Sequence, residues 1–369
     1  MTIYYDNAST TPALPCACGQ FWGNPSSPHA LGISAERELA AARQTIAGSL
    51  ECRPEEIIFT SGGTESNNLA LIGTAMASRR KNFTFFAQPW EHPSVLQPLE
   101  YIKAQGLANV VLAPHGQWHS SGPCLAAISH VNHETGDIND VQDIAMSLKQ
   151  NASHAIIFVD GVQGFCKHKI DLSSIDMYSF SAHKCHGPTG VGGLVLRNNI
   201  RITPLLYGGG QENKVRPGTE NLTGIQHMAE VVKTLGENEV AKVKSIIMEL
   251  ASELPNVHIN AMTSNVSPYI LNMSFVGIKG EPFVHLLSEK GLYASMGAAC
   301  QSRKNTKTAL EIMGFSKERA QAAIRFSFSC LNTPEEAIAA KEIIKDCFFW
   351  LHGVDRGSRA HSNRKESSI

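Results

Sequence analysis

The chain has 369 residues, of which 43% are hydrophobic and 18% charged, a composition typical of globular proteins and not of disordered ones. Lys and Arg (32) nearly balance Asp and Glu (33), and the formal net charge of −1 argues against broad electrostatic binding to nucleic acid or acidic membranes. The nine Cys are odd in number and scattered, which argues against a disulfide scaffold and favours a reducing, cytoplasmic compartment. The first residues carry no pattern of a secretory signal, and no window is apolar enough to predict a membrane span.

Apolar segments alternate with amphipathic ones through the first half of the chain. Segments rich in Ile, Val and Phe predict strands at 56–61, 82–88, 110–114, 126–132, 155–161, 177–183 and 192–197. Amphipathic stretches at 65–78, 94–106 and 141–150 predict helices between several of them. Strands separated by helices of this length are typical of βαβ units. We therefore expect an α/β fold with a mostly parallel, buried, seven-stranded sheet.

The pattern changes in the last third of the chain. A helical pattern at 223–254 predicts one long helix of the kind that links two domains. Mixed strand and helix patterns follow it, which predicts a smaller α+β domain. We expect a large ligand-binding domain at 14–230, a small domain made of 1–13 and 231–353, and a disordered, Ser-rich tail at 354–369.

Lys184 follows a predicted strand and precedes a Gly-Pro turn, between His183 and Cys185. A surface Lys is the ordinary interpretation of such a residue. Ser181 and His183 favour a functional interpretation of Lys184, because they offer hydrogen-bond donors for an anion beside an amine held on a tight turn. A Lys in this setting can form a Schiff base with a carbonyl cofactor such as pyridoxal phosphate.

Asp160 ends the predicted strand at 155–161, and Gln163 follows three residues later. An Asp at a strand end is often only a turn former or a helix cap. However, ligands of open α/β sheets bind beyond the carboxyl ends of the strands. A carboxylate that keeps the pyridine nitrogen protonated and a Lys that holds the aldehyde are the pair that pyridoxal phosphate requires.

A phosphate group needs a cradle, and the segment EIIFTSGGTESNNLALIG predicts a strand, a Gly-Gly turn and a helix. Backbone N–H groups of Gly63 and Thr64 would then face an anion, supported by the helix dipole and the Thr64 hydroxyl. A Gly-Gly turn is weak evidence by itself. It gains weight if Ser181 and His183 converge on the same site.

These segments, taken in order, resemble the cysteine desulfurases, which are class V aminotransferase-like, fold-type I pyridoxal phosphate enzymes. The resemblance begins at YYDNASTTP and ends at AAIRFSFS, so it covers nearly the whole chain. Between these lie GNPSSPHALG, TSGGTESNNLA, WEHPSVL, HVNHETG, VDGVQG, SFSAHKCHGPTGVGGL, YGGGQENKVRPGTEN and SMGAACQSRK. The last two also resemble selenocysteine lyase, which uses the same cofactor.

The resemblance implies a role for each matching residue, although each also has an ordinary structural interpretation. The residues implied to hold or contact the cofactor are Gly63, Thr64, His92, Asp160, Gln163, Ser181, His183 and Lys184. Lys184 and His92 would also transfer protons. Thr219 would reach the phosphate of a partner subunit, which implies a homodimer with shared sites. Arg325 would bind the substrate carboxylate through its planar guanidinium, with Asn7 as a further candidate.

Cys300 lies in SMGAACQSRKNTKTA, a small-residue and polar stretch that predicts an exposed loop. A thiol near Arg303 and Lys304 can ionise and attack, whereas a buried Cys is usually inert. In the resembled family this Cys takes sulfur from the substrate and becomes a persulfide. We interpret the other eight Cys as core or surface residues.

The sequence departs from the family pattern at two places. His133 in HVNHETG stands where the family has an Asn that helps to position the cofactor and the substrate carboxylate. A His can also donate a hydrogen bond there, but it is bulkier and titrates near neutrality. The segment ALPCACGQFW is about half the usual length, so an N-terminal helix would be missing. Both departures bear on turnover or substrate choice.

The resemblance implies a cytoplasmic enzyme that converts L-cysteine into L-alanine and leaves a persulfide on Cys300 for a sulfur-acceptor protein, for example in iron–sulfur cluster biosynthesis. Alternatives are a selenocysteine lyase, a weakly active homologue that acts as a binding partner in a sulfur-transfer complex, and an aminotransferase of the same fold. The spacing of Cys16, Cys18, His183 and His186 matches no zinc motif, so we expect no metal.

Overall fold

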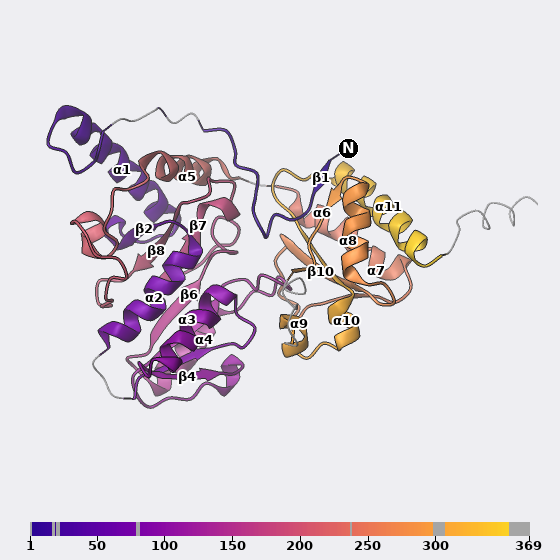
Figure 1. Cartoon of the computed structure of the whole chain (residues 1–369), viewed down its shortest axis with the longest axis horizontal. Coiled ribbons are helices and arrows are strands. Elements are labelled where there is room, and N and C mark those ends of the chain that lie inside the picture. The colour runs from indigo at the N-terminus through magenta and orange to yellow at the C-terminus, as the bar shows by residue number, and fades with distance from the viewer. Residues whose placement is uncertain are drawn as a thin grey trace, which may run out of the picture. The chain divides into compact units, whose positions relative to one another are not determined.

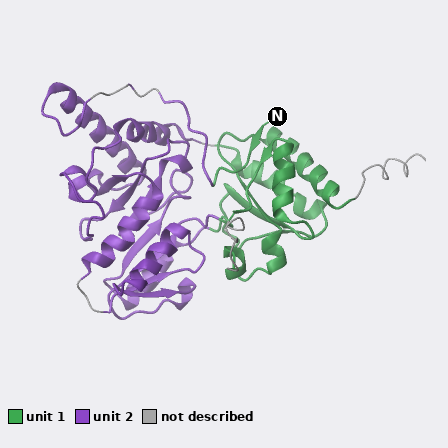
Figure 2. Cartoon of the chain, in the orientation of Figure 1, with its two compact units in different colours: residues 1–8, 134–137, 237–369 green, residues 9–133, 138–236 purple. Residues whose placement is uncertain are grey.

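The computed structural model describes residues 2–16, 19, 23–78, 82–236, 238–297 and 307–353. The chain forms two compact units, shown in Figure 2. Unit 1 consists of Met1–Ala8, Glu134–Asp137 and Glu237–Ile369, and unit 2 of Ser9–His133 and Ile138–Gly236. The predicted tail at 354–369 lies outside the described residues, and the predicted domain boundaries stay a prediction.

The seven-stranded sheet of unit 2 has the strand order β2-β8-β7-β6-β5-β3-β4. Strands β4, β3, β5, β6 and β7 pair in parallel, whereas β8 is antiparallel to both of its neighbours. This confirms the predicted mostly parallel sheet. The strands are β2 Ile57–Thr60, β3 Thr84–Ala87, β4 Asn109–Leu112, β5 Cys124–Ser129, β6 Ile156–Asp160, β7 Met177–Ser181 and β8 Gly192–Leu196.

Helices cover both faces of this sheet (Figure 1). They are α1 Ala30–Ser49, α2 Gly63–Ala77, α3 Pro93–Ala104, α4 Val141–Asn151 and α5 Leu222–Thr234, with short 3₁₀ helices at Pro54–Glu56, His115–Gln117, Ala182–Lys184 and Gln211–Lys214. Side chains alternate between the two faces: Phe86 packs with α1, α4 and α5, and Phe85 packs with α2 and α3. Both rings are at most 3% exposed, so each contributes about 1.5–3 kcal/mol through apolar burial.

Unit 1 is an α+β unit with its own core, in which Phe275, Phe283, Phe326 and Phe348 are buried. Strands β12 Ala323–Ser327, β10 Ile270–Phe275 and β9 Val257–Ile259 form an antiparallel sheet, and β1 Ile3–Tyr4 pairs in parallel with β11 Leu292–Tyr293. The helices are α6 Val240–Met248, α7 Leu250–Glu253, α8 Gly280–Glu289, α9 Ala309–Ile312, α10 Lys317–Gln321 and α11 Pro334–Leu351.

The predicted long helix at 223–254 is wrong. The segment forms three helices, because α5 ends at Thr234, α6 begins at Val240 and α7 begins at Leu250. Gly236 disfavours helix in the first break by about 1 kcal/mol relative to Ala. The Asn238 side chain then accepts a hydrogen bond from the Val240 N–H at 3.2 Å, which satisfies a backbone donor at the start of α6.

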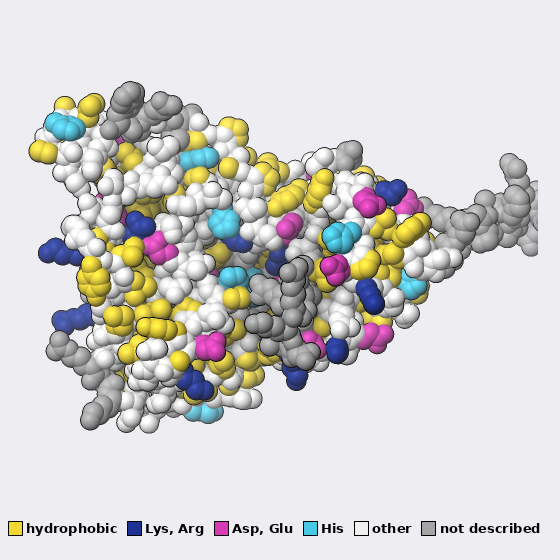
Figure 3. Space-filling view, viewed as in Figure 1, with side chains coloured by type: hydrophobic (Ala, Val, Ile, Leu, Met, Phe, Trp, Pro, Cys, Tyr) yellow, Lys and Arg dark blue, Asp and Glu magenta, His cyan; other side chains and the backbone are white. Residues whose placement is uncertain are grey.

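Helix α1 was not predicted, although its buried residues Ala35, Leu39, Ala42 and Ile46 recur every three or four positions. None of the described helices is long and apolar enough to cross a membrane. On the face shown in Figure 3, acidic and basic side chains are interspersed over the described surface, with no broad region of one sign.

Candidate active site

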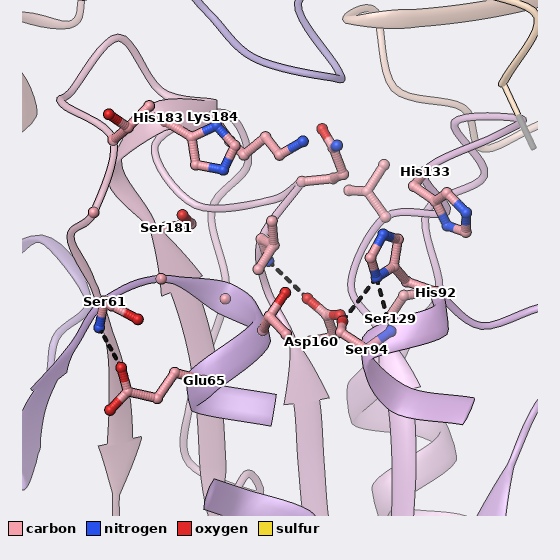
Figure 4. A pocket seen from close by; sticks show the side chains of 18 residues that line it. Ser61, Glu65, His92, Ser94, Ser129, His133, Asp160, Ser181, His183 and Lys184 are labelled. Atoms are coloured by element: carbon pink, nitrogen blue, oxygen red, sulfur yellow. Dashed lines mark hydrogen bonds between the residues drawn. The ribbon is translucent and has the colours of Figure 1, made fainter. Parts of the chain in front are cut away.

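A pocket of about 370 Å³ opens in unit 2 at the carboxyl ends of β5, β6 and β7, which end at Ser129, Asp160 and Ser181. Parallel strands bring their carboxyl ends to one edge of a sheet, so these side chains meet there. The predicted residues that line the pocket are Gly63, Thr64, His92, His133, Asp160, Gln163, Ser181, His183 and Lys184. Figure 4 shows the labelled members of this set around one space.

Lys184 ends the short 3₁₀ helix Ala182–Lys184 that follows β7. Its Nζ donates a hydrogen bond to the backbone oxygen of Ser9 at 2.6 Å. In Figure 4 the Lys184 side chain extends over the pocket, while Asp160 projects from the end of its strand. The amine and the carboxylate predicted to hold a pyridine ring therefore lie in one pocket.

Asp160 is held in place by two hydrogen bonds. Its Oδ1 accepts from the Val162 N–H at 3.0 Å, and its Oδ2 accepts from Asn67 Nδ2 at 2.8 Å. The residue is 6% exposed. A buried carboxylate with its oxygens fixed in this way is preorganised to pair with a cationic partner.

The segment predicted to form a phosphate cradle consists of a strand, a Gly62–Gly63 turn and a helix. Strand β2 leads into Gly62, whose φ of +151° is rarely adopted by residues with side chains, and α2 begins at Gly63. A Cβ atom at Gly63 would lie 2.4 Å from Val162 Cγ2, so a larger residue there would require Val162 to shift. The turn therefore leaves the first N–H groups of α2 available to an anion.

Ser181 and His183 are the side-chain donors on the other wall of this cradle. Within the described part of the chain the Ser181 Oγ is buried and has no hydrogen-bond partner. Burial, aided by the positive charges of Lys184 and Lys167, lowers the pKa of His183 to about 4. His183 is therefore neutral at physiological pH. A buried hydroxyl without a partner costs free energy, which a bound acceptor such as a phosphate oxygen would recover.

Glu65 lies at the rim of the cradle and is neutralised locally. Arg216 Nε lies 2.7 Å from its Oε1, and the Ser61 N–H donates to its Oε2 at 2.8 Å. Burial alone would raise the pKa of Glu65, but these hydrogen bonds outweigh burial and lower the pKa. The ion pair offsets a negative charge that would otherwise repel a phosphate.

His133, the departure from the family pattern, contacts His92. The two rings meet edge to face, with centroids 5.0 Å apart and planes at 82°. Figure 4 shows both imidazoles on the same side of the pocket. The site therefore has two adjacent imidazoles where the resembled family has one imidazole and one amide.

Glu91 was missed in the sequence analysis and lies directly behind the pocket. Its Oε1 accepts from the Ser129 N–H at 3.2 Å, and the residue is 3% exposed. Burial is the main cause that raises the pKa of Glu91 to about 8; the hydrogen bond from Ser129 opposes the increase and the charge of Asp160 adds to it. Burial disfavours the charged form of Glu91, so Glu91 is protonated at neutral pH.

This predicts how stability depends on pH. The pKa of Glu91 is higher in the folded state than in the unfolded state. The contribution of Glu91 to the free energy of unfolding is therefore complete below about pH 4.5 and is lost as the pH rises towards 8. Between pH 5 and 8 the wild type should lose about 1–4 kcal/mol of unfolding free energy that Glu91→Gln retains. Urea unfolding at both pH values measures this, with the exposed Glu100→Gln as control. Parallel pH profiles for wild type and Glu91→Gln would contradict the expectation.

The remaining predicted residues lie elsewhere. Thr219 is exposed on the loop that follows the 3₁₀ helix Gln211–Lys214 and does not line this pocket. Arg325 and Asn7 belong to unit 1. Cys300 lies outside the described residues.

In unit 1 the Arg325 guanidinium is buried between two carboxylates. Its NH1 lies 3.7 Å from Glu134 Oε1, and its NH2 lies 3.4 Å from Asp6 Oδ1. Asn7 Nδ2 donates to the backbone oxygens of Ser327 and Tyr4 at 2.9 and 3.1 Å. These contacts fix the amide of Asn7 to the backbone, and its role in substrate binding stays a prediction.

Cys16 is disulfide-bonded, a feature that the sequence did not predict. The other described cysteines are free thiols: Cys52, Cys124, Cys166, Cys185, Cys330 and Cys347. Throughout the described ranges, no group of three or more His, Cys, Asp and Glu side chains is arranged to hold a metal ion.

The fold and the pocket define a class of protein: the chain belongs to the aminotransferase class-V family, whose model matches residues 3–339. A NifS/IcsS protein homolog from Lactobacillus delbrueckii subsp. bulgaricus is 35% identical over 364 residues, which cover 91% of this chain and 94% of that protein. A cysteine desulfurase IscS from Dictyoglomus turgidum is 32% identical over 363 residues, which cover 90% of this chain and 91% of that protein.

Solved structures agree with this assignment. A NifS-like protein matches with a TM-score of 0.87 and 31% identity, covering 95% of this chain and 100% of that chain. SspA, solved in complex with cysteine, matches with a TM-score of 0.77 and 27% identity, covering 90% of this chain and 100% of that chain. The predicted family and fold are confirmed. The family depends on pyridoxal phosphate, so the predicted cofactor is confirmed as well.

The residues in the pocket fit this cofactor. The Gly62–Gly63 turn and the unpartnered Ser181 hydroxyl suit its phosphate, Asp160 suits its ring nitrogen, and Lys184 offers a primary amine for its aldehyde.

Proposed function

We propose that this chain is a cysteine desulfurase, which converts L-cysteine into L-alanine and transfers the sulfur to Cys300 as a persulfide. The observation that supports this most strongly is the placement of Lys184 and Asp160 in one pocket with the phosphate cradle. Relatives named cysteine desulfurase, aligned over at least nine-tenths of this chain, support the same activity.

Each pocket residue has a proposed role in this reaction. When bound, pyridoxal phosphate supplies an aldehyde that condenses with amines and a ring that accepts electrons from the substrate α-carbon. Lys184 Nζ would hold the aldehyde in the absence of substrate and would accept the α-proton of bound L-cysteine. Asp160 would keep a proton on the ring nitrogen. The α2 N-terminus, Ser181 and neutral His183 would hold the phosphate. Gln163 would contact the ring hydroxyl, and His92 would stack on the ring and assist proton transfer.

Cys300 is proposed to attack the substrate sulfur as a thiolate. The S–S bond of the persulfide forms while the substrate C–S bond breaks, and the substrate carbon gains a proton to become the methyl group of alanine. One Cys thiol and one L-cysteine thus give one Cys persulfide and one L-alanine, without an external oxidant or reductant. Arg325 is proposed to bind the substrate carboxylate, a role that suits its rigid pair of donors.

A homodimer with shared sites belongs to the same proposal, as does a cytoplasmic location. It predicts that a mixed dimer of one Lys184→Ala and one Thr219→Ala protomer keeps one intact site, formed by the wild-type Lys of one protomer and the wild-type Thr of the other. Such a dimer should retain about half of the wild-type activity at limiting cofactor, while each parent dimer is impaired at both sites. Differently tagged protomers, purified as the mixed dimer, allow the measurement. If each site instead used Lys184 and Thr219 of the same protomer, the mixed dimer would have about half the activity of the Thr219→Ala dimer. That result would contradict shared sites.

The substrate is tested by the products. Purified protein given L-cysteine should release L-alanine, and a keto acid in its place would indicate an aminotransferase. Faster alanine release from L-selenocysteine at equal concentration would favour a selenocysteine lyase.

The contact between His133 and His92 favours one further candidate, a weakly active homologue that serves as a binding partner in a sulfur-transfer complex. Turnover that His133→Asn increases by tenfold or more would support that candidate.

A further inference from the structure

Four polar side chains form a continuous chain of hydrogen bonds behind the pocket. Asn67 Nδ2 lies 2.8 Å from Asp160 Oδ2 and 2.8 Å from Ser94 Oγ. Ser94 Oγ lies 2.7 Å from His92 Nδ1, and the Ser94 backbone N–H donates to the same nitrogen at 3.1 Å. Asn67 and Ser94 were not among the residues predicted from the sequence.

The direction of each hydrogen bond follows from chemistry. Asn67 Nδ2 donates to Asp160 Oδ2 at 2.8 Å, because an amide nitrogen only donates and a carboxylate oxygen accepts. The second N–H of this nitrogen then donates to Ser94 Oγ. The Ser94 hydroxyl hydrogen is left to donate to His92 Nδ1, where the Ser94 backbone N–H also points. Because Nδ1 accepts from both donors, neutral His92 carries its hydrogen on Nε2.

The fold makes this chain of groups rigid. His92 is the N-cap of α3, and Ser94 is the second residue of that helix. Asn67 lies on α2, one helical turn after Gly63, and α2 packs against α3. Asn67 is 0% exposed and Ser94 is 9% exposed, so water does not compete readily for the hydrogen bonds that Asn67 donates to Asp160 and Ser94. A neutral His92 also suits the positive end of the α3 dipole.

We propose that Asn67 and Ser94 are positioning residues that hold His92 in one neutral tautomer, with Nδ1 as acceptor and the hydrogen on Nε2, and that Asn67 couples this tautomer to the orientation of Asp160. His92 therefore presents an N–H donor to the reacting groups. The expected effects on alanine formation rest on the proposed function. The expected effect on cofactor affinity depends only on the contact between Asn67 and Asp160.

The two residues are expected to give different results when changed. Ser94 contacts His92 but not Asp160, so Ser94→Ala should lower kcat for alanine formation about tenfold and leave KM and the cofactor Kd within about twofold. Asn67 contacts Asp160 as well, so Asn67→Asp should lower kcat and also weaken cofactor binding about tenfold or more, because it places a second acid beside Asp160. Asn67→Ala removes the same donors without added charge and replaces Asn67→Asp if that variant does not fold.

The experiment combines cofactor titration by absorbance with steady-state alanine assays on the full chain. Thr74→Ala is the matched control, because Thr74 is a buried residue on α2 whose hydroxyl donates to the Ala70 carbonyl of the same helix at 2.6 Å. Ser94→Thr, unlike Ser94→Ala, keeps a hydroxyl at this position, so its kcat should stay close to that of the wild type. In a His92→Gln background, Ser94→Ala should cause no further loss, because the group that it orients is absent.

Two results would overturn the proposal. The first is a Ser94→Ala loss that adds in full to the His92→Gln loss, because that outcome means Ser94 acts independently of His92. The second is an Asn67 variant with wild-type cofactor affinity. The cofactor titration needs no amino-acid substrate, so it tests the coupling to Asp160 even if alanine formation, and with it the proposed function, fails.

Discussion

A Lys184→Ala variant is expected to lose the visible absorbance of covalently held cofactor and to form alanine at least about 1,000-fold more slowly than wild type. Lys184 is proposed to hold the aldehyde and to accept the substrate α-proton, and proton transfer by a positioned side chain contributes about 10²–10⁴-fold by itself. No other Lys lines the pocket among the described residues. The Ser9 carbonyl, which accepts a hydrogen bond from Nζ at 2.6 Å, would remain without substituting for the amine.

Spectra of the Lys184→Ala variant after desalting, with alanine quantified in parallel, give the measurement. Lys169→Ala, a change of an exposed Lys outside the pocket, serves as the control and should resemble wild type. A desalted Lys184→Ala protein that keeps the wild-type spectrum would remove Lys184 from its proposed role.

A Cys300→Ser variant is expected to keep the cofactor spectrum and to lose alanine release by about 100-fold or more. A serine hydroxyl is a far weaker nucleophile towards sulfur than a thiolate, whereas the cofactor contacts proposed for unit 2 do not involve residue 300. The variant therefore separates cofactor binding from sulfur removal. Alanine release at the wild-type rate would exclude Cys300 from the reaction.

Four of the described free thiols are poor substitutes for Cys300 because burial raises their pKa. It does so for Cys124 and Cys330, and it raises the pKa of Cys52 and Cys347 to about 11. Such thiols hold little thiolate at neutral pH. Cys330→Ser is therefore a suitable control for Cys300→Ser and should release alanine at the wild-type rate.

The large sheet could be predicted from sequence because its strands are short, apolar and separated by helices, and because a parallel sheet gathers its strand ends at one edge. That same rule predicted a functional position for Asp160 at the end of its strand, and the neighbouring strand ends there at Ser181. The error at 223–254 arose because helical periodicity continues across Gly236 and Asn238, although the backbone turns there. Periodicity reports which faces are apolar but does not report where a helix stops.

The groups behind the pocket could not be predicted from sequence. Asn67 and Ser94 are 27 positions apart and meet only because α2 packs against α3. The sequence does not distinguish Glu91 from a surface Glu, because its burial beside Ser129 and Asp160 depends on the fold. The excursion of Glu134–Asp137 into unit 1 likewise depends on long-range contacts, among them the hydrogen bonds from the Met262 and Thr263 N–H groups to Asp137.

The central claim is that the pocket of unit 2 uses pyridoxal phosphate to remove sulfur from L-cysteine. The most direct test is the absorbance spectrum of the purified protein, recorded before and after L-cysteine is added, with alanine and sulfide quantified in the same samples in the presence of a thiol reductant. We predict a yellow protein whose spectrum changes on addition of L-cysteine and which releases alanine and sulfide in equal amounts over many turnovers. A protein that binds the cofactor but forms no alanine from L-cysteine would contradict the claim.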